Sequence, residues 1–262
     1  MRQDFPQTLT SHFFVFSQSC YIISVKKKIP LSGKEVYNRR DIILQRGAHD
    51  LFHATKDMRS LNLTLLTDLY EITMMQGYFE TQENQTVVFD VFFRDNPNKG
   101  GYSVMAGLDQ VIDYIKNLNF SYEDVDYLRG LGLFSEDFLH YLSGFHFSGD
   151  IYAIPEGSVI FPREPLLKVV APIMEAQLVE TAILTILNHQ CLIATKASRV
   201  VYAAQGDGIM EFGLRRAQGP DAGLYGARAA VIGGCVGTSN VLAGEMFDVP
   251  VMGTHAHSWI MT

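Results

Sequence analysis

The sequence predicts an α/β protein, with an N-terminal mixed α/β domain followed by the first strands of an incomplete α/β barrel. Amphipathic helices and short apolar strands alternate along the chain after Met58. From residue 209 onward the order becomes strand, helix, strand, helix, strand, which is the spacing of parallel βαβ units. A closed barrel needs eight strands and roughly 200 residues or more. The chain is therefore expected to be truncated inside its second domain.

The composition indicates a globular chain that can bury a sizeable core, because 47% of its residues are hydrophobic. A formal net charge of −7 argues against a nucleic-acid binder. The three cysteines form no Cys-x-x-Cys pair, which favours reduced thiols in the cytoplasm over a disulfide framework. The sequence has no apolar run approaching the roughly 18 residues of a membrane-spanning helix, so no membrane partner is expected.

The N-terminal segment, residues 1–57, differs in charge from the rest of the chain. It is net basic and lacks clear periodicity, whereas the remainder is net acidic. We interpret it as an extension that is disordered or not native, with an organelle transit peptide as the alternative. Residues 58–205 are then expected to form the N-terminal domain with its connecting helices, and residues 206–262 the start of the barrel.

The regular part of the chain is expected to open with a helix. Thr64 or Thr67 is predicted to cap it, Asp68 and Glu71 lie in its first turn, and it runs to about Gln76. The other expected strands of the N-terminal domain are 86–93, 102–106, 151–154, 159–161 and 167–170, and the other expected helices are 108–118, 122–131, 136–142, 175–188 and 192–204.

The C-terminal part predicts three barrel strands, 209–214, 235–238 and 249–253, with helices at 221–232 and 239–246 between them. Active sites of α/β barrels lie at the carboxyl ends of the strands. Two histidines and two hydroxyls follow the last strand in the run Gly253-Thr-His-Ala-His-Ser258. A histidine at an open strand end can act as a nucleophile or proton carrier, although a plain hydrogen-bonding role is the alternative.

Four groups of residues at strand ends or helix starts carry a resemblance to a known family. Taken in this order and spacing, they resemble the nicotinate phosphoribosyltransferases, a type II phosphoribosyltransferase family, over about residues 61–262. The groups are Leu65-Leu-Thr-Asp-Leu-Tyr-Glu71; Phe92-Phe-Arg-Asp-Asn-Pro97 with Gly100-Gly-Tyr102; Glu211-Phe-Gly-Leu-Arg-Arg-Ala-Gln-Gly-Pro220; and Gly237-Thr-Ser-Asn240 with Gly253–Ser258.

The resemblance implies the first step of NAD salvage from nicotinate. Nicotinic acid is joined to phosphoribosyl pyrophosphate, giving nicotinate mononucleotide and pyrophosphate, and ATP hydrolysis is coupled to this step. His257 matches the histidine that becomes phosphorylated, and His255 is expected to be only its neighbour. Mg²⁺ is expected to accompany phosphoribosyl pyrophosphate. No metal-ligating residue of the chain is predicted, because no acidic cluster has convincing spacing.

The resemblance also implies which residues hold the substrates. Phe212 and Tyr70 match two residues that stack on the pyridine ring, and the tyrosine comes from the other subunit of a homodimer. Arg215 matches a catalytic arginine that contacts both the ring region and the ribose phosphate. Thr254 matches a nicotinate contact. Arg94 and Arg216 are weaker candidates that could equally be solvated charges.

Ser239 is predicted to select the base. Relatives that use nicotinamide have an aspartate at the matching position, which accepts a bond from the amide, whereas a serine hydroxyl can donate to the carboxylate of nicotinate. Two alternatives stay open: a nicotinamide- or quinolinate-using relative, and a truncated, non-catalytic form that dimerises with a full-length enzyme. Coding sequence that continues past Thr262 would favour an enzyme over the short form.

Overall fold

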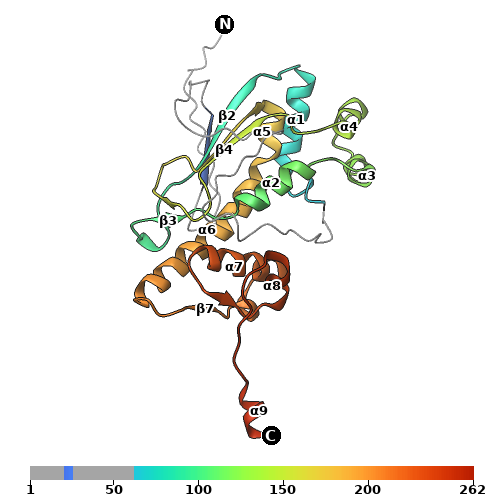
Figure 1. Cartoon of the computed structure of the whole chain (residues 1–262). Coiled ribbons are helices and arrows are strands. Elements are labelled where there is room, and N and C mark those ends of the chain that lie inside the picture. The colour runs from blue at the N-terminus through green and yellow to red at the C-terminus, as the bar shows by residue number, and fades with distance from the viewer. Residues whose placement is uncertain (1–20, 26–61) are drawn as a thin grey trace.

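The structure, a computed structural model, describes residues 21–25, as backbone only, and residues 62–262. Figure 1 shows an upper body of sheet and helices and a smaller lower part that contains β7, α7 and α8. The described elements are, in chain order, β1 (Tyr21–Val25), α1 (Leu69–Glu80), β2 (Thr86–Phe93), η2 (Pro97–Lys99), β3 (Ser103–Val104), α2 (Leu108–Asn117), α3 (Tyr122–Gly130), α4 (Glu136–Ser143), β4 (Asp150–Ala153), β5 (Val159–Ile160), β6 (Leu167–Pro172), α5 (Ile173–Leu178), α6 (Glu180–Ala203), β7 (Met210–Glu211), η3 (Leu214–Arg216), α7 (Pro220–Ile232), β8 (Gly237–Thr238), α8 (Val241–Phe247) and α9 (His257–Met261).

The upper body is built on a four-stranded sheet in the order β1–β2–β6–β4, in which every pairing is antiparallel. β2 is the predicted strand 86–93, and its β-branched and aromatic side chains are almost all buried. β1 lies inside the segment that was expected to be disordered or not native, and there Tyr21–Val25 pairs antiparallel with β2. The rest of residues 1–61 lies outside the described residues, and the predicted domain limits stay a prediction.

The first helix, α1, begins later than predicted. Asp68, rather than Thr64 or Thr67, occupies the position that precedes it. The two hydroxyls bond elsewhere: Thr64 donates to the carbonyl of Asn119 at 2.6 Å and Thr67 to the carbonyl of Leu178 at 3.4 Å. The two hydroxyls therefore bond to residues far along the chain, and neither caps α1 as the local sequence pattern predicts.

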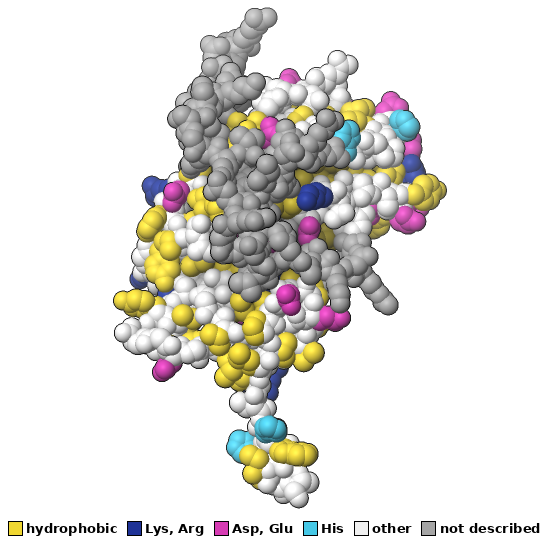
Figure 2. All heavy atoms as spheres, viewed as in Figure 1, with side chains coloured by type: hydrophobic (Ala, Val, Ile, Leu, Met, Phe, Trp, Pro, Cys, Tyr) yellow, Lys and Arg dark blue, Asp and Glu magenta, His cyan; other side chains and the backbone are white. Residues whose placement is uncertain are grey.

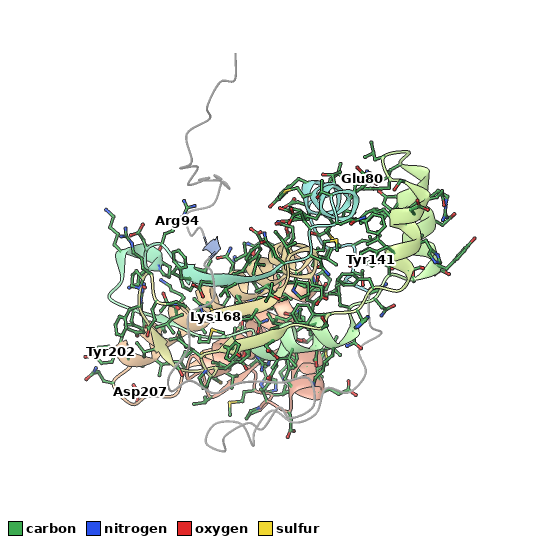
Figure 3. The ribbon with its side chains drawn as sticks, turned by 90° about the horizontal axis from the view of Figure 1, so that it is seen from above. Glu80, Arg94, Tyr141, Lys168, Tyr202 and Asp207 are labelled. Atoms are coloured by element: carbon green, nitrogen blue, oxygen red, sulfur yellow. The ribbon has the colours of Figure 1, made fainter. Side chains whose placement is uncertain are left out.

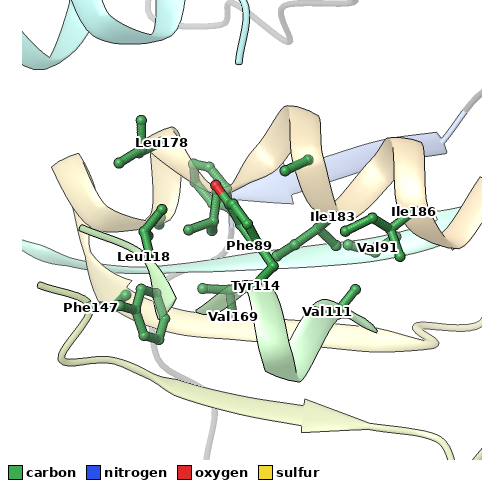
Figure 4. Close-up of a cluster of buried hydrophobic side chains, with 14 of the residues drawn as sticks. Phe89, Val91, Val111, Tyr114, Leu118, Phe147, Val169, Leu178, Ile183 and Ile186 are labelled. Atoms are coloured by element: carbon green, nitrogen blue, oxygen red, sulfur yellow. The ribbon is translucent and has the colours of Figure 1, made fainter. Parts of the chain in front are cut away.

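The two helices expected at 175–188 and 192–204 are divided differently. The break falls at Val179, and α6 runs without interruption through residues 189–191. The stretch Ile173–Ala203 is long and apolar enough to cross a membrane by length and composition, but 56% of its most apolar window is buried inside the protein. It is the central core helix of this fold: Ile183, Ile186 and Leu178 pack with Phe89, Val91 and Val169 of the sheet (Figure 4).

The lower part has the parallel arrangement that the sequence predicts. β7 pairs parallel with β8, and Thr238 forms a parallel bridge with Val251. The strands are much shorter than predicted. Residues 214–216 form the 3-10 helix η3, and of residues 249–253 only Val251 forms a bridge. α8 also begins later than predicted, since Asn240 caps it and its side chain accepts a bond from the Ala243 amide.

A buried arginine joins the two parts. Arg228 of α7 is 4% exposed and donates to both carboxylate oxygens of Glu156, at 2.9 and 2.7 Å, and to Asp109 of α2 at 2.6 Å. Glu156 also accepts bonds from the amides of Gly107 and Leu108 at the start of α2. Burial opposes ionisation of Glu156, but Arg228 and these amides outweigh it and lower the pKa of Glu156.

Candidate functional site

The candidate site lies where three neighbouring parallel strand segments end. The Ser239 amide donates to the Glu211 carbonyl at 3.0 Å, and the Met252 amide donates to the Thr238 carbonyl at 2.9 Å. β8 therefore lies between β7 and the segment around Val251. Because parallel strands end at one edge, this register brings the positions that follow them to the same side. Phe212, Ser239 and Gly253-Thr254 are those positions.

Phe212 and Arg215 leave the end of β7 in a tight turn. Phe212 directly follows the strand and is 39% exposed, so its ring is only partly covered by the protein. Arg215 and Arg216 stand on η3, where both are exposed. A Cβ at position 213 would approach the Glu211 carboxylate to 2.7 Å, so a larger residue there would displace that side chain. The partly exposed Phe212 ring is therefore followed in the chain by two exposed guanidinium groups, those of Arg215 and Arg216.

Ser239 is held between two fully or nearly buried neighbours. Thr238 is 0% exposed and Asn240 is 3% exposed, while Ser239 itself is half-buried. The Asn240 side chain donates to the carbonyl of Gly223 in α7 at 3.2 Å in addition to capping α8. The later start of α8 thus leaves the Ser239 hydroxyl at the strand end instead of inside a helix.

Two neighbouring strand ends are tied by a carboxylate that the sequence analysis gave no role. Glu211 accepts a bond from the Thr238 hydroxyl at 2.6 Å and another from the amide of Gly213. The Thr238 hydroxyl in turn accepts a bond from the Asn240 amide at 3.0 Å. The signal that could have found this pair is register, because Glu211 and Thr238 are direct partners in the parallel ladder.

The two histidines lie away from these strand ends. Thr254, His255 and His257 are all exposed, and α9, which begins at His257, is joined to the lower part by an extended segment (Figure 1). Figure 2 shows histidine side chains on this projecting tip. The rings of His255 and Trp259 lie 6.5 Å apart. The structure therefore brings Phe212, Arg215 and Ser239 to one edge but does not bring His257 to them.

Tyr70 is also remote from Phe212 within this chain. It stands near the start of α1, at the opposite end of the molecule from β7 (Figure 1). Seen from above, Glu80 at the end of α1 and Asp207, which precedes β7, lie on opposite sides of the molecule (Figure 3). The Tyr70 side chain is 48% exposed. A single chain of this shape does not place both aromatic rings on one ligand.

An acidic group next to Tyr70 was not found from the sequence. Glu71 is 0% exposed and accepts a bond from Gln177, whose amide also lies 3.4 Å from Glu180. Burial raises the pKa of Glu71. Burial, with the nearby carboxyls of Glu71 and Asp68, raises the pKa of Glu180 to about 7. The helix start that carries Tyr70 thus packs on a carboxyl that titrates near neutral pH.

Metal ligands and thiols complete the inventory of the site. Within residues 62–262, no group of three or more His, Cys, Asp or Glu side chains could hold a metal ion. Cys191 and Cys235 are buried, the Cys191 thiol donates to the Ala106 carbonyl at 3.2 Å, and Cys20 lies outside the described residues.

Comparisons with known proteins identify the same family over both parts of the chain. The model of the nicotinate phosphoribosyltransferase N-terminal domain matches residues 65–188, and that of the nicotinate phosphoribosyltransferase family matches residues 208–262. The nicotinate phosphoribosyltransferase pncB2 of Mycobacterium tuberculosis is 47% identical over 196 residues, which is 75% of this chain and 42% of that protein. The Bacillus subtilis nicotinate phosphoribosyltransferase is 46% identical over 200 residues, 76% of this chain and 41% of that protein.

Solved structures agree with this assignment. Human nicotinic acid phosphoribosyltransferase superposes with a TM-score of 0.69 at 36% identity, covering 74% of this chain and 40% of the human chain. A nicotinate-nucleotide pyrophosphorylase from Pyrococcus furiosus gives a TM-score of 0.62 at 27% identity, covering 80% of this chain and 46% of that one. The chain thus spans less than half the length of each of these four relatives.

Proposed function

We propose that this chain, which belongs to the nicotinate phosphoribosyltransferase family, forms the nicotinate-recognising part of an enzyme with that activity. The enzyme joins nicotinic acid to phosphoribosyl pyrophosphate and releases nicotinate mononucleotide and pyrophosphate. The proposal is supported by the register of the three parallel strand segments, which are followed in the chain by Phe212, Ser239 and Gly253-Thr254, with Arg215 three residues after Phe212.

The chemistry of that edge suits a flat anionic ring. The partly exposed Phe212 ring can stack on the electron-poor pyridine, an interaction worth on the order of 1 kcal/mol beyond burial. The Arg215 guanidinium can pair with a carboxylate or a phosphate by two parallel hydrogen bonds. The transfer step leaves negative charge on the departing pyrophosphate, and an arginine beside the ring stabilises that charge. Thr254 adds a hydroxyl that can bond the substrate carboxylate.

Ser239 favours nicotinate over nicotinamide. Its hydroxyl can donate to a carboxylate, whereas an aspartate at this position would repel nicotinate and accept a bond from the nicotinamide amide. The half-buried setting of Ser239 strengthens this discrimination, because electrostatic interactions grow as water is excluded. A nicotinamide-using relative is thus the less favoured alternative. A short, non-catalytic form that dimerises with a full-length enzyme is the other alternative.

We further propose that residues 206–262 form the first strands of the phosphoribosyltransferase barrel and that the working unit is a homodimer. The remoteness of Tyr70 from Phe212 in one chain supports a shared site, in which Tyr70 of one subunit contacts the ring bound by the other. ATP is proposed as the phosphoryl donor to His257. Mg²⁺ is proposed to arrive with phosphoribosyl pyrophosphate and would neutralise its phosphates. The cytoplasm, with its reduced thiols, is the proposed compartment.

The test compares the two bases with the protein made from the complete coding sequence that contains this chain. Wild-type protein is expected to turn over nicotinate with a kcat/KM at least about a hundred-fold above that for nicotinamide, the discrimination that about 3 kcal/mol provides. Ser239→Asp is expected to shift this ratio towards nicotinamide, and Ser143→Asp, the same change at an exposed position at the end of α4, serves as a matched control. Turnover of nicotinamide equal to that of nicotinate by the wild type would refute the proposal.

A further inference from the structure

Glu211 connects the ends of two neighbouring strands through both of its carboxylate oxygens. One oxygen accepts the Thr238 hydroxyl at 2.6 Å, and the other accepts the Gly213 amide. The Thr238 hydroxyl is completely buried and also accepts the Asn240 amide at 3.0 Å. Four consecutive groups are therefore linked from the turn after β7, across β8, to the cap of α8.

This chain of bonds flanks the two residues proposed to recognise the pyridine ring. Phe212 lies between Glu211 and Gly213, and Ser239 lies between Thr238 and Asn240. The backbone on both sides of each recognition residue is thus bound directly or through one hydroxyl to a single carboxylate. A rigid second layer of this kind is what keeps contact residues within the small tolerance that selective binding needs.

The Glu211 carboxylate is an unexpected charge beside a site proposed for two anionic substrates. A negative group there repels anionic substrates, so its presence at this position calls for a structural reason. Hydrogen bonds to a charged group are about twice as strong as those between neutral groups, so a carboxylate fastens the two strand ends more firmly than an amide would. Its two oxygens are each engaged by a donor of the protein.

We propose that Glu211, held by Thr238, is a positioning residue that sets the spacing between Phe212 and Ser239 and thereby the selectivity for nicotinate over nicotinamide. The inference rests on the proposed function. In this inference Glu211 and Thr238 do not contact the substrate. The selectivity between the two bases depends on how the ends of β7 and β8 are held relative to each other, as well as on the Ser239 hydroxyl.

The experiment uses a matched pair of variants in the protein made from the complete coding sequence. Thr238→Val keeps the shape but removes the hydroxyl, which leaves one Glu211 oxygen and the Asn240 amide without their partner. Thr238→Ser keeps the hydroxyl and loses only a methyl group. Thr238→Val is expected to lower the ratio of kcat/KM for nicotinate to that for nicotinamide by about ten- to a hundred-fold, the range for a lost hydrogen bond to a charged group. Thr238→Ser is expected to restore the wild-type ratio.

Glu211→Gln provides the second variant if Thr238→Val does not fold, because it keeps the size of the side chain and removes its charge. It is expected to lower the same ratio, although removing a negative charge would by itself favour the anionic base, and it is not expected to raise the KM for phosphoribosyl pyrophosphate. An equal loss of turnover with both bases, or a raised KM for phosphoribosyl pyrophosphate with an unchanged base ratio, would overturn the inference. The first result would mean general destabilisation, and the second a direct substrate contact.

Hydrogen exchange separates failure of this inference from failure of the proposed function. If the wild type turns over neither base, the proposed function fails, and positioning is read from amide exchange of residues 211–215 and 237–240. Faster exchange of both segments in Thr238→Val, with wild-type exchange in Thr238→Ser, would support the inference. Unchanged exchange in Thr238→Val would refute it.

Discussion

Replacing Arg228 is expected to destabilise the fold strongly, because its side chain is a buried cation bonded to two carboxylates. Its guanidinium is 4% exposed and makes three charge-assisted bonds of 2.6 to 2.9 Å, two to Glu156 and one to Asp109. Arg228→Met keeps most of the side-chain volume and removes the charge. Glu156 would then stay buried beside α2 without this cation. Breaking a buried pair in this way costs about 3–5 kcal/mol, because an uncompensated charge remains.

The matched control is Arg129→Met, the same chemical change in an exposed ion pair. Arg129 of α3 binds Asp126 and Glu136, and its side chain is 41% exposed. Solvent screens such pairs, so this variant is expected to change the urea midpoint little or not at all. Urea unfolding followed by circular dichroism at pH 7 measures both variants against the wild type.

The pH dependence of stability tests the ion pair between Arg228 and Glu156 independently. The pKa of Glu156 is lowered in the folded state, so its contribution to stability is present above its ordinary pKa and is lost as the pH falls through the lowered value. Without Arg228, burial raises the pKa of Glu156, so the stability gap between wild type and Arg228→Met should narrow as the pH falls through that raised pKa and should stop changing below the lowered pKa of the wild type. A loss no larger than that of Arg129→Met, or a gap that is constant with pH, would refute the reasoning.

Two further predictions concern the histidine and the acidic group next to Tyr70. Incubation with γ-labelled ATP is expected to label the wild-type protein and His255→Ala but not His257→Ala; label retained by His257→Ala would exclude it as the acceptor. The pKa of Glu180 is raised from 4.5 to about 7, so stability present at pH 4.5 is lost as the pH rises through 7, by at most about 3 kcal/mol. Glu180→Gln should flatten this urea-midpoint profile, whereas the exposed Glu245→Gln should leave it unchanged; the same profile in both variants would contradict the assignment.

The sequence pattern within a segment was sufficient to predict those helices and strands that are determined by local alternation or capping. The strand at β2 and the helix α4, with Ser135 at its cap, lie where the sequence predicts them, because alternation and capping chemistry are local. The parallel arrangement of β7, β8 and Val251 also follows from the spacing of elements. The lengths of these strands could not be predicted, since they depend on which residues find a neighbour.

The errors arose where a distant partner decides the structure. The break expected near residues 189–191 is absent because tertiary contacts serve the polar groups of α6 there: Gln190 donates to Gln110 of α2 at 2.7 Å, and the Cys191 thiol bonds the Ala106 carbonyl at 3.2 Å. In the sequence these residues look like a polar interruption of a helix. Only the packing of α6 against α2 and β3 turns them into interior positions.

The same reasoning explains why candidate recognition residues could be proposed from the sequence, whereas the residues that support them could not. Phe212 and Ser239 follow apolar strands, and a side chain at a strand end is a recognisable position for chemistry. Glu211 and Thr238 are 27 residues apart and meet only because two parallel strands are in register. A shift of this register by one residue would turn Thr238 to the opposite face and break the bond to Glu211. Any selectivity that depends on the distance between Phe212 and Ser239 is therefore a property of the strand pair, and it cannot be assigned to either residue alone.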